Sequence, residues 1–217
     1  MEGEASGGGA RDILLSEIQH RVRNSLSLVT SFLNLQAADA ADPSVRDALS
    51  KASGRVLAIA RLHDRLYRLE NLREVDLGEC LADVARGVEA QAGPPANVDL
   101  VVDVAPLSVS GAIAFPVGLI VNELLTNSYK YAFPGNRPGR IRLGLDGDGA
   151  RAHVVVADTG IGYPRGARAG LGTRVTRALT HQIGGSLRRL DGDGCAHVLS
   201  FSPNGARTDG ANTGPHA

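Results

Sequence analysis

The stretch NELLTNSYKY, residues 122–131, decides the fold of this chain. It continues the apolar run IAFPVGLIV, and the two together predict one helix over 113–133. Glu123 and Asn127 are four residues apart on one face of that helix, and Lys130 follows three residues later. Carboxylate and amide oxygens suit Mg²⁺ or its bound waters, and a lysine can neutralise phosphate charge. Taken alone, such residues are more often an ordinary exposed helix face.

Two glycine-containing motifs follow this helix along the chain. DTGIG, residues 158–162, ends the apolar strand VVVAD with Asp158 and then supplies two glycines. A carboxylate at a strand end can accept a hydrogen bond from an exocyclic amine such as that of adenine, and glycines let a backbone approach a ligand closely. GLG, residues 170–172, precedes a helix whose first N–H groups can bind an anion. Its spacing differs from that of the dinucleotide and P-loop motifs.

Helices and strands alternate around these motifs. A helix capped by Asp76 is expected over 75–91, and the alternating run VDLVVDV predicts a strand over 98–104. Helices interleaved with mixed strands predict a two-layer α/β sandwich for this part of the chain. The remaining elements expected are strands over 140–146 and 151–158, a helix over 170–185, and strands over 186–191 and 196–202.

The N-terminal third of the chain predicts two long antiparallel helices. The first runs from about Arg11 to Ala38, the break DAADPS offers Asp42 or Ser44 as a cap, and the second helix follows from Pro43. Such a hairpin cannot bury its apolar stripe alone, and a second copy would complete a four-helix bundle. The stripe expected on the first helix consists of Leu15, Ile18, Val22, Leu26, Val29 and Leu33.

The segment QHRVRN, residues 19–24, places His20 away from this stripe. Glu17 and Asn24 lie one turn away on the same polar face. The imidazole should therefore face solvent or a partner surface. A lone surface histidine is most often part of a solvated face, so its role depends on the rest of the chain.

The composition excludes several classes of protein. Among 217 residues, 23 are Lys or Arg and 23 are Asp or Glu, and this balance with few aromatic residues argues against a nucleic-acid partner. Cys80 and Cys195 are far apart, so we expect two ordinary thiols in a reducing compartment rather than a disulfide framework or zinc site. Without a signal peptide or an apolar run of about twenty residues, the chain is expected to be cytoplasmic. Residues 1–10 and 204–217 are expected to be disordered.

In combination, these motifs resemble the ATP-binding domain shared by sensor histidine kinases, Hsp90-like chaperones, MutL and type II topoisomerases. NELLTNSYKY resembles the N box of that domain, DTGIG the first glycine box and GLG the second. EIQHRVRNSL, residues 17–26, resembles the phosphoacceptor region of the second subgroup of histidine kinases, which is related to the HWE-type kinases. GRVLAIARLHDRLY, residues 54–67, is similar to the second helix of that region. The resemblance implies a hairpin domain for dimerisation and phosphotransfer over 11–70, followed by a Bergerat-type ATP-binding domain over 71–203.

The resemblance also implies a role for each matching residue. His20 becomes the phosphorylated histidine, and Asn24 would orient a water for dephosphorylation. Glu17 would hold the imidazole tautomer so that one ring nitrogen can attack. Glu123 would help at the metal ion or its water.

ATP and Mg²⁺ are the cofactors that the resemblance implies. Asn127 becomes the Mg²⁺ ligand, Lys130 a phosphate contact and Asp158 the adenine contact. The nucleotide would therefore lie between the N box and the two glycine boxes. The residues expected to bind it are Asn122, Asn127, Lys130, Tyr131, Asp158, Gly160, Gly162, Gly170, Leu171 and Gly172.

The chain departs from the family pattern at several places. It has no tryptophan, and Asn122 stands where the HWE-type N box has a histidine, so the second subgroup fits better. Cys195 and Ala196 replace a usual Gly-Thr pair near the end of the domain. Arg21 follows His20 where the larger kinase class has an acid, so no base is directly beside the histidine.

The function implied is that of a two-component kinase core. It would phosphorylate itself on His20 with ATP and pass the phosphoryl group to an aspartate of a response-regulator receiver domain. A homodimer through the hairpin is expected, and a separate sensor protein or a longer parent chain would supply the input. One alternative is a histidine phosphotransfer protein with a non-catalytic ATPase-like domain. Another is an anti-sigma-type serine kinase, which would lack the hairpin. Transfer within one chain or across a dimer stays open.

Overall fold

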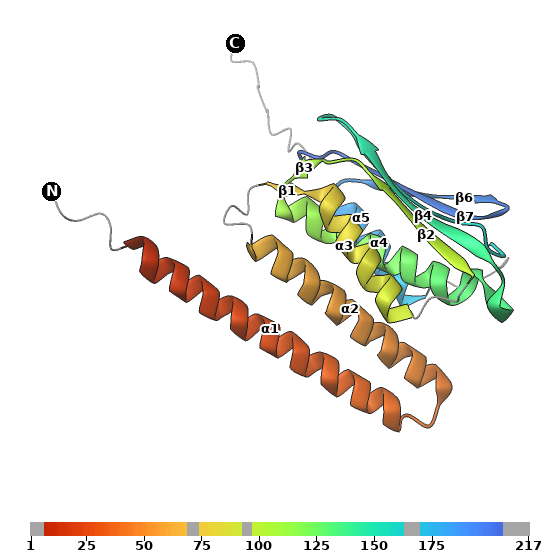
Figure 1. Cartoon of the computed structure of the whole chain (residues 1–217), viewed down its shortest axis with the longest axis horizontal. Coiled ribbons are helices and arrows are strands. Elements are labelled where there is room, and N and C mark those ends of the chain that lie inside the picture. The colour runs from red at the N-terminus through yellow and green to blue at the C-terminus, as the bar shows by residue number, and fades with distance from the viewer. Residues whose placement is uncertain (1–6, 69–73, 93–96, 163–169, 206–217) are drawn as a thin grey trace, which may run out of the picture.

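The computed structural model of the chain describes residues 7–68, 74–92, 97–162 and 170–205. It consists of a long helical hairpin beside a layered α/β sandwich, with the second helix of the hairpin lying between the first helix and the sandwich (Figure 1). This arrangement confirms the predicted fold class. Among the residues that the structure describes, no helix combines the length and apolar character needed to cross a membrane.

The hairpin consists of α1 (Gly7–Asp39) and α2 (Pro43–Arg68). The first helix begins before Arg11, so residues 7–10, which composition predicted to be disordered, are helical. The expected tails over 1–6 and 206–217 lie outside the described residues.

A capping interaction starts the second helix of the hairpin. The Ser44 backbone N–H donates to Oδ1 of Asp42 at 2.8 Å, with Pro43 as the first helical residue. Further along, the Ser53 hydroxyl donates to Oδ1 of Asn34 at 2.7 Å. This second bond aligns the two helices, because it pairs one residue of each across their interface.

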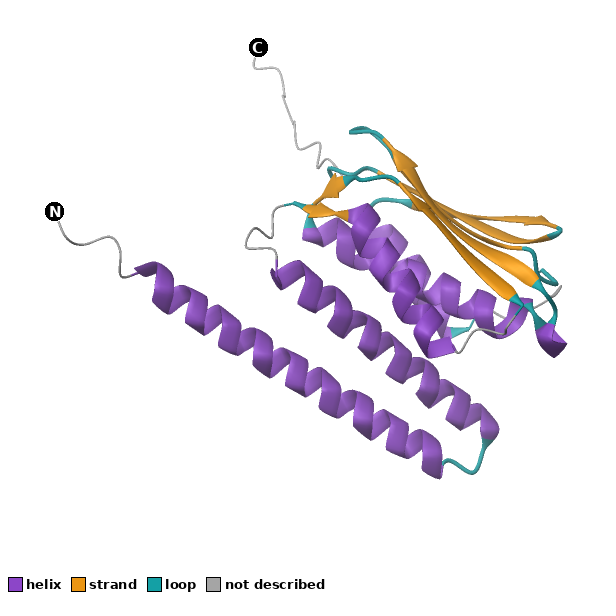
Figure 2. Ribbon diagram, in the orientation of Figure 1, coloured by secondary structure: helices purple, strands orange, loops and turns teal. Residues whose placement is uncertain are grey.

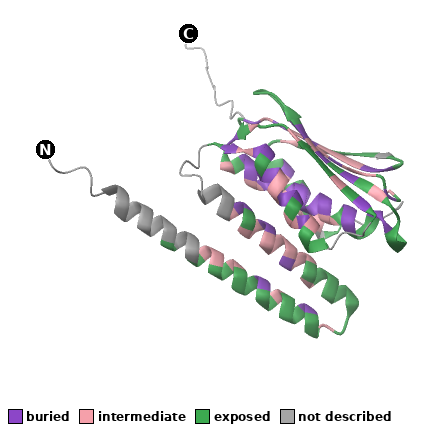
Figure 3. Ribbon diagram, viewed as in Figure 1, coloured by how far each residue is buried: buried purple, intermediate pink, exposed green. Residues whose placement is uncertain are grey.

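The first helix has two apolar sides rather than the single predicted stripe. Thr30 and Ala37 are buried, with Leu26 and Leu33 half-buried on the same side, facing α2. Val29 was expected in this stripe but is exposed. Three large residues on the opposite side are also exposed. They are Leu28, Phe32 and Leu35, which are 72%, 61% and 67% exposed. The described part of α1 is mainly green in the ribbon of Figure 3, which marks exposed residues.

The sandwich has one layer of strands and one of helices (Figure 2). Its five-stranded sheet has the order β2-β4-β5-β7-β6, with the β2–β4 pair parallel and the other pairs antiparallel. Helices cover one face of the sheet and leave the other open. The strands are β2 (Val98–Val104), β4 (Gly139–Gly147), β5 (Ala152–Asp158), β6 (Ser186–Gly192) and β7 (Gly194–Phe201), and the helices are α3 (Leu77–Ala92), α4 (Gly111–Asn127) and α5 (Leu171–Gln182).

Two short strands outside the main sheet were missed in the sequence. They are β1 (Val75–Asp76) and β3 (Ser108–Val109), which pair antiparallel. Asp76 also caps α3 as predicted, since its Oδ1 accepts the Glu79 backbone N–H at 3.3 Å. The segment that enters the sandwich is therefore held in place by its pairing with β3 and by the cap of α3.

The core lies between the sheet and its three helices and extends into the hairpin. Leu62 of α2 is 2% exposed and packs on α4 at Gly118, where an added Cβ would lie only 2.7 Å from Cδ2 of Leu62. Gly87 of α3 likewise accommodates the guanidinium of Arg61. Small residues on α3 and α4 thus let the second hairpin helix approach closely. The buried side chains of this core include Leu77, Leu81, Val117, Ile120, Val121, Ile141, Leu143, Val154 and Leu199.

Candidate functional site

The predicted helix over 113–133 is α4 followed by one π-helical turn, η1 (Ser128–Ala132). Asn122 and Glu123 are buried on α4, whereas Asn127, Lys130 and Tyr131 are exposed near its end. π-Helical turns are rare in proteins, but those that occur are often found at functional sites, because they redirect side chains that a regular helix would place elsewhere. The N-box residues therefore occupy both the interior and the rim of the site.

Asp158 ends β5 beside this turn, and both its carboxylate oxygens accept hydrogen bonds. The Ser128 hydroxyl donates to Oδ2 at 2.9 Å, and the Gly160 backbone N–H donates to Oδ1 at 3.1 Å. These two donors fix the orientation of the carboxylate while leaving each oxygen a second lone pair. Ser128 was not singled out in the sequence. Its only signal is its place within NELLTNSYKY, directly after Asn127.

The first glycine box lies directly against the end of the N-box helix. A Cβ at Gly160 would lie 2.4 Å from the carbonyl oxygen of Ala132, and the next residue, Ile161, donates its N–H to that same oxygen at 2.9 Å. Gly162 has φ of 74°, a left-handed conformation that favours glycine. Both glycines are therefore required by the backbone path of this loop. The residues from 163 to 169 lie outside the described part.

Gly160→Ala is expected to lower the free energy of unfolding by about 2 kcal/mol, because the added methyl meets backbone that cannot move aside alone. Gly149→Ala is the matched control, since a Cβ there meets nothing within 4 Å. Urea unfolding of the two variants measures the difference. Equal midpoints for both would contradict the close approach of the loop to Ala132.

The second glycine box lies against the buried glutamate of the N box. Gly170 precedes α5 in an extended conformation, and a Cβ there would meet nothing within 4 Å. A Cβ at Gly172, by contrast, would lie 2.7 Å from Oε2 of Glu123. The start of α5 and the N box therefore meet at Glu123. The side chain of Leu171, between the two glycines, lies outside what the structure describes.

Glu123 is itself held by an arginine from the hairpin. Nε of Arg55 donates to Oε1 at 2.6 Å and a terminal nitrogen donates to Oε2 at 2.8 Å, which makes the pair bidentate. The hydrogen bonds to Glu123 raise the pKa of the Arg55 guanidinium. Two weaker contacts follow nearer the hairpin turn: Lys130 Nζ lies 3.3 Å from Oδ1 of Asp47, and Lys51 Nζ lies 5.2 Å from the ring centre of Tyr131.

Tyr129 lies in the same turn but points into the core. Burial raises the pKa of its phenol to about 12, and the nearby carboxylate of Glu89 adds to this rise. Its hydroxyl finds no hydrogen-bond partner among the described residues. Tyr129 is therefore a neutral packing residue at physiological pH.

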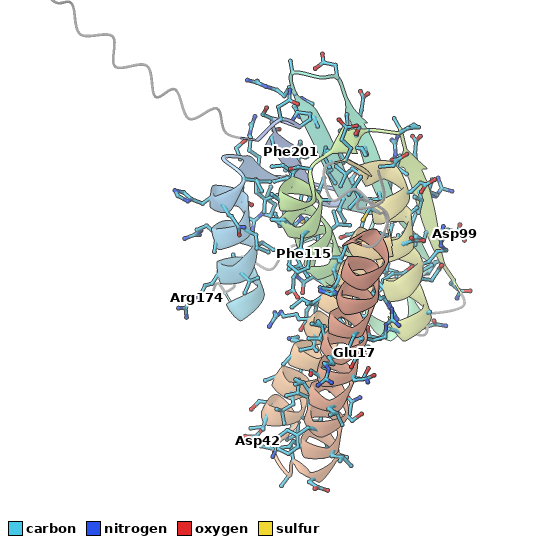
Figure 4. All side chains as sticks on the ribbon, turned by 90° about the vertical axis from the view of Figure 1, so that its left-hand side faces the viewer. Glu17, Asp42, Asp99, Phe115, Arg174 and Phe201 are labelled. Carbon is cyan, nitrogen blue, oxygen red and sulfur yellow. The ribbon has the colours of Figure 1, made fainter. Side chains whose placement is uncertain are left out.

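The predicted phosphoacceptor region lies on α1, apart from these motifs. His20 is within the helix, but its side chain lies outside the described part. Glu17 is exposed on α1 (labelled in Figure 4), and Oε1 of its carboxylate accepts from Nε of Arg21 at 2.8 Å. Asn24 is exposed, as expected for the polar face of the helix. The structure thus brings the N box and both glycine boxes together, and leaves the residues around His20 separate from them.

The oxygen atoms near the N box suit a metal ion whose other ligands are mostly phosphate and water oxygens. Within the described residues, no group of three or more His, Cys, Asp or Glu side chains could hold a metal ion. The exposed amide of Asn127 is a single hard donor at the rim of the site. Mg²⁺ commonly binds with one or two protein oxygens plus substrate phosphates, so the site fits Mg²⁺ brought by a nucleotide.

Comparison with known proteins finds two family models along the chain. Residues 17–90 match the family model described as "Histidine kinase", and residues 114–207 match that of the "Histidine kinase-, DNA gyrase B-, and HSP90-like ATPase". The sensor histidine kinase PdtaS of Mycobacterium tuberculosis is 30% identical over 84% of this chain and 37% of its own length. Blue-light-activated histidine kinase 2 of Erythrobacter litoralis is 31% identical over 81% of this chain and 53% of its own length. The chain therefore spans only part of these relatives.

A solved structure extends the similarity to three dimensions. The histidine kinase domain of the Erythrobacter litoralis EL346 blue-light-activated histidine kinase superposes with a TM-score of 0.66 at 27% identity, covering 88% of this chain and 92% of that one. The match includes both the hairpin and the sandwich, because the sandwich alone would cover a smaller share. Through its histidine kinase region and its adjoining ATPase region, the chain belongs to the sensor histidine kinase family.

Proposed function

We propose that this chain is a kinase core that transfers the γ-phosphoryl group of ATP to His20, and from there to an aspartate of a response-regulator receiver domain. The observation that carries the proposal is the carboxylate of Asp158. Ser128 and Gly160 orient it at the strand end, where its remaining lone pairs suit the exocyclic amine of adenine. We assign residues 11–70 to phosphotransfer and dimerisation and residues 71–203 to ATP binding.

The residues near the N box and the second glycine box would bind the triphosphate. Asn127 would hold Mg²⁺ together with phosphate oxygens and water, and the ion would neutralise charge on the phosphates. Lys130 adds a positive charge at the rim. A Cβ at Gly170 would meet nothing within 4 Å, which leaves the start of α5 open to phosphate there, and Gly172 would contribute its backbone N–H beside Glu123. Glu123 would act at the ion or its water. The walls of the nucleotide site are assigned to Asn122, Tyr131, Gly162 and Leu171.

His20 would supply the nucleophile. A neutral ring nitrogen attacks the γ-phosphorus, the bond to the β,γ-bridging oxygen breaks, ADP leaves, and the ring loses a proton to solvent. Glu17 would hold the tautomer of the imidazole by accepting a hydrogen bond from one ring nitrogen. To do so, its carboxylate must give up its hydrogen bond with Arg21. Asn24 would orient a water for dephosphorylation.

Incubation of the purified chain with γ-labelled ATP and Mg²⁺ tests the proposal, with ATP affinity measured in parallel by calorimetry. Bound label that is labile in acid and stable in base identifies phosphohistidine. Absence of both label and ATP binding would overturn the kinase assignment and favour a phosphotransfer protein with a non-catalytic ATPase-like domain. Passage of the label to a receiver domain tests the second step.

A second copy of the chain is the partner that best fits the exposed apolar side of α1. Leu28, Phe32 and Leu35 lie on one side of the helix, away from α2, and Val45 at the start of α2 is 47% exposed. Burying such side chains against another hairpin removes apolar area from water at about 25 cal/mol per Å². Two hairpins would then form the four-helix bundle that one hairpin leaves incomplete.

Phe32→Glu is expected to convert a dimer into a monomer, because a charge at this position would be buried without a partner in the bundle. Ser27→Glu, at an exposed position on another side of α1, is the control and should leave the dimer intact. Light scattering during size-exclusion chromatography measures the mass. A wild-type monomer at tens of micromolar would argue against the dimer.

A further inference from the structure

Three charged residues of α2 hold the N-box end of the sandwich against the hairpin. Asp47, Lys51 and Arg55 are spaced by four residues and therefore share one face of the helix. Their partners lie on α4 and η1, which run antiparallel to α2 (Figure 1). We call the six residues the polar latch: Asp47 with Lys130, Lys51 with Tyr131, and Arg55 with Glu123.

The Arg55–Glu123 pair is the most buried and best aligned contact of the polar latch. The Glu123 residue is 7% exposed, and the side chain of Arg55 is 18% exposed. Both carboxylate oxygens accept from the arginine, so the pair uses the geometry in which the two groups bind most strongly. Asp47 also pairs with Lys51 on its own helix, and the hydrogen bond from Lys51 lowers the pKa of the Asp47 carboxyl.

The polar latch engages the residues that ATP would need. The carboxylate of Glu123 was assigned above to the metal ion or its water, and the ammonium group of Lys130 was assigned to the phosphates. Arg55 uses one lone pair on each oxygen of Glu123 and offsets the charge of the carboxylate, so Mg²⁺ or its water must compete with the guanidinium for that group. A triphosphate would likewise compete with Asp47 for Lys130.

The polar latch also holds the nucleotide site far from His20. The Ser53–Asn34 hydrogen bond sets the register of the hairpin, so Arg55 lies opposite the region of Phe32 on α1. Twelve residues separate Phe32 from His20, which corresponds to about 18 Å along the helix axis at 1.5 Å per residue. Glu123 is therefore level with the half of the hairpin nearer its turn, whereas His20 is in the other half.

We infer that the polar latch is an inhibitory contact between the two domains, and that ATP binding and transfer to His20 require its release. The inference rests on the proposed function for the roles of Glu123, Lys130 and His20. Release separates the hairpin and the N box at the polar end of their interface. The apolar contact of Leu62 with Gly118, farther along α2, is the natural pivot because it lies away from the latch.

Arg55→Met is the first test, since it leaves the buried Glu123 carboxylate without its partner in the latched state and so favours the released state. ATP affinity in the presence of Mg²⁺ should increase about tenfold, because a binding-competent state that was a minor population becomes the major one. Asp47→Asn should act in the same direction with a smaller effect and keeps the test available if Arg55→Met fails to fold. Arg46→Met is the matched control, because that arginine bonds the Ala40 carbonyl within the hairpin.

A distance measurement separates this inference from the proposed function. Spin labels at Gln36→Cys on α1 and His181→Cys on α5, both exposed, report the separation of the domains by pulsed electron resonance. Without nucleotide, the latched chain and Arg46→Met should give one narrow distribution, and Arg55→Met a broadened or shifted one. An unchanged distribution and unchanged affinity in Arg55→Met would overturn the latch, as would weaker ATP binding. Failure of the wild type and every variant to bind ATP would instead overturn the proposed function. The spin-label distances would then decide by themselves whether the polar latch holds the two domains together.

Discussion

His20→Ala is expected to abolish the acid-labile, base-stable label that the chain acquires from γ-labelled ATP, while ATP affinity stays at the wild-type value. The reason is that alanine removes the only ring assigned as nucleophile, and its position on α1 lies apart from the N box and both glycine boxes. Loss of covalent label with retained binding separates a phosphoacceptor from a nucleotide contact. Filter-bound radioactivity and calorimetry on the same preparation measure the two quantities.

His181→Ala is the matched control for this experiment, because His181 is exposed in the last turn of α5 and on the domain that would donate the phosphoryl group. It should label like the wild type. Persistence of base-stable label in His20→Ala would place the phosphoacceptor on another of the six histidines of the chain. Histidines in the strands, such as His153 and His197, would then be the next to replace.

Periodicity predicted the regular elements well, because each is long enough to repeat its pattern. The strand expected over 98–104 is β2 with the same bounds, and the helix expected from Pro43 is α2. The strands β1 and β3 have two residues each, which is too short for an alternating pattern to be recognised. Their pairing depends on tertiary contacts that no local pattern records.

The side of α1 that faces α2 was harder to predict, since apolar residues occur on more than one side of this helix. Val29 completes the expected stripe in the sequence yet is exposed, while Thr30 is buried. The Thr30 hydroxyl donates to the Leu26 carbonyl at 2.8 Å, so a polar residue can be buried within the helix without losing its hydrogen bond. Helical periodicity alone therefore did not decide the packing face.

The motifs located the candidate site, but not the contacts that shape it. NELLTNSYKY contains Ser128, which donates to Asp158 and begins a π-helical turn that a period of 3.6 residues does not predict. The Arg55–Glu123 pair joins residues that are 68 positions apart. Charges on an exposed helix face look alike in a sequence whether they meet solvent or another domain. The latch therefore required the three-dimensional structure.

Asp158→Asn is expected to weaken ATP binding by about ten- to a hundredfold, which corresponds to the roughly 1.5–3 kcal/mol of a hydrogen bond to a charged group. The substitution should leave the loop in place. An asparagine oxygen can still accept the Gly160 N–H, and its NH₂ group can donate to the Ser128 hydroxyl, which accepts as well as donates. What is lost is the negative charge and an acceptor for the adenine amine. Asp99→Asn, an exposed aspartate of β2, is the control.

Inosine triphosphate, which lacks the exocyclic amine, shows whether Asp158 acts through that amine. The wild-type chain should bind it about as weakly as Asp158→Asn binds ATP, and the substitution should add little further loss for inosine triphosphate. Such non-additivity is the signature of two groups that contact each other. If Asp158→Asn weakens both nucleotides equally, the carboxylate serves to hold Ser128 and Gly160 in place rather than to contact the base, because removing a structural support affects every ligand of the site alike.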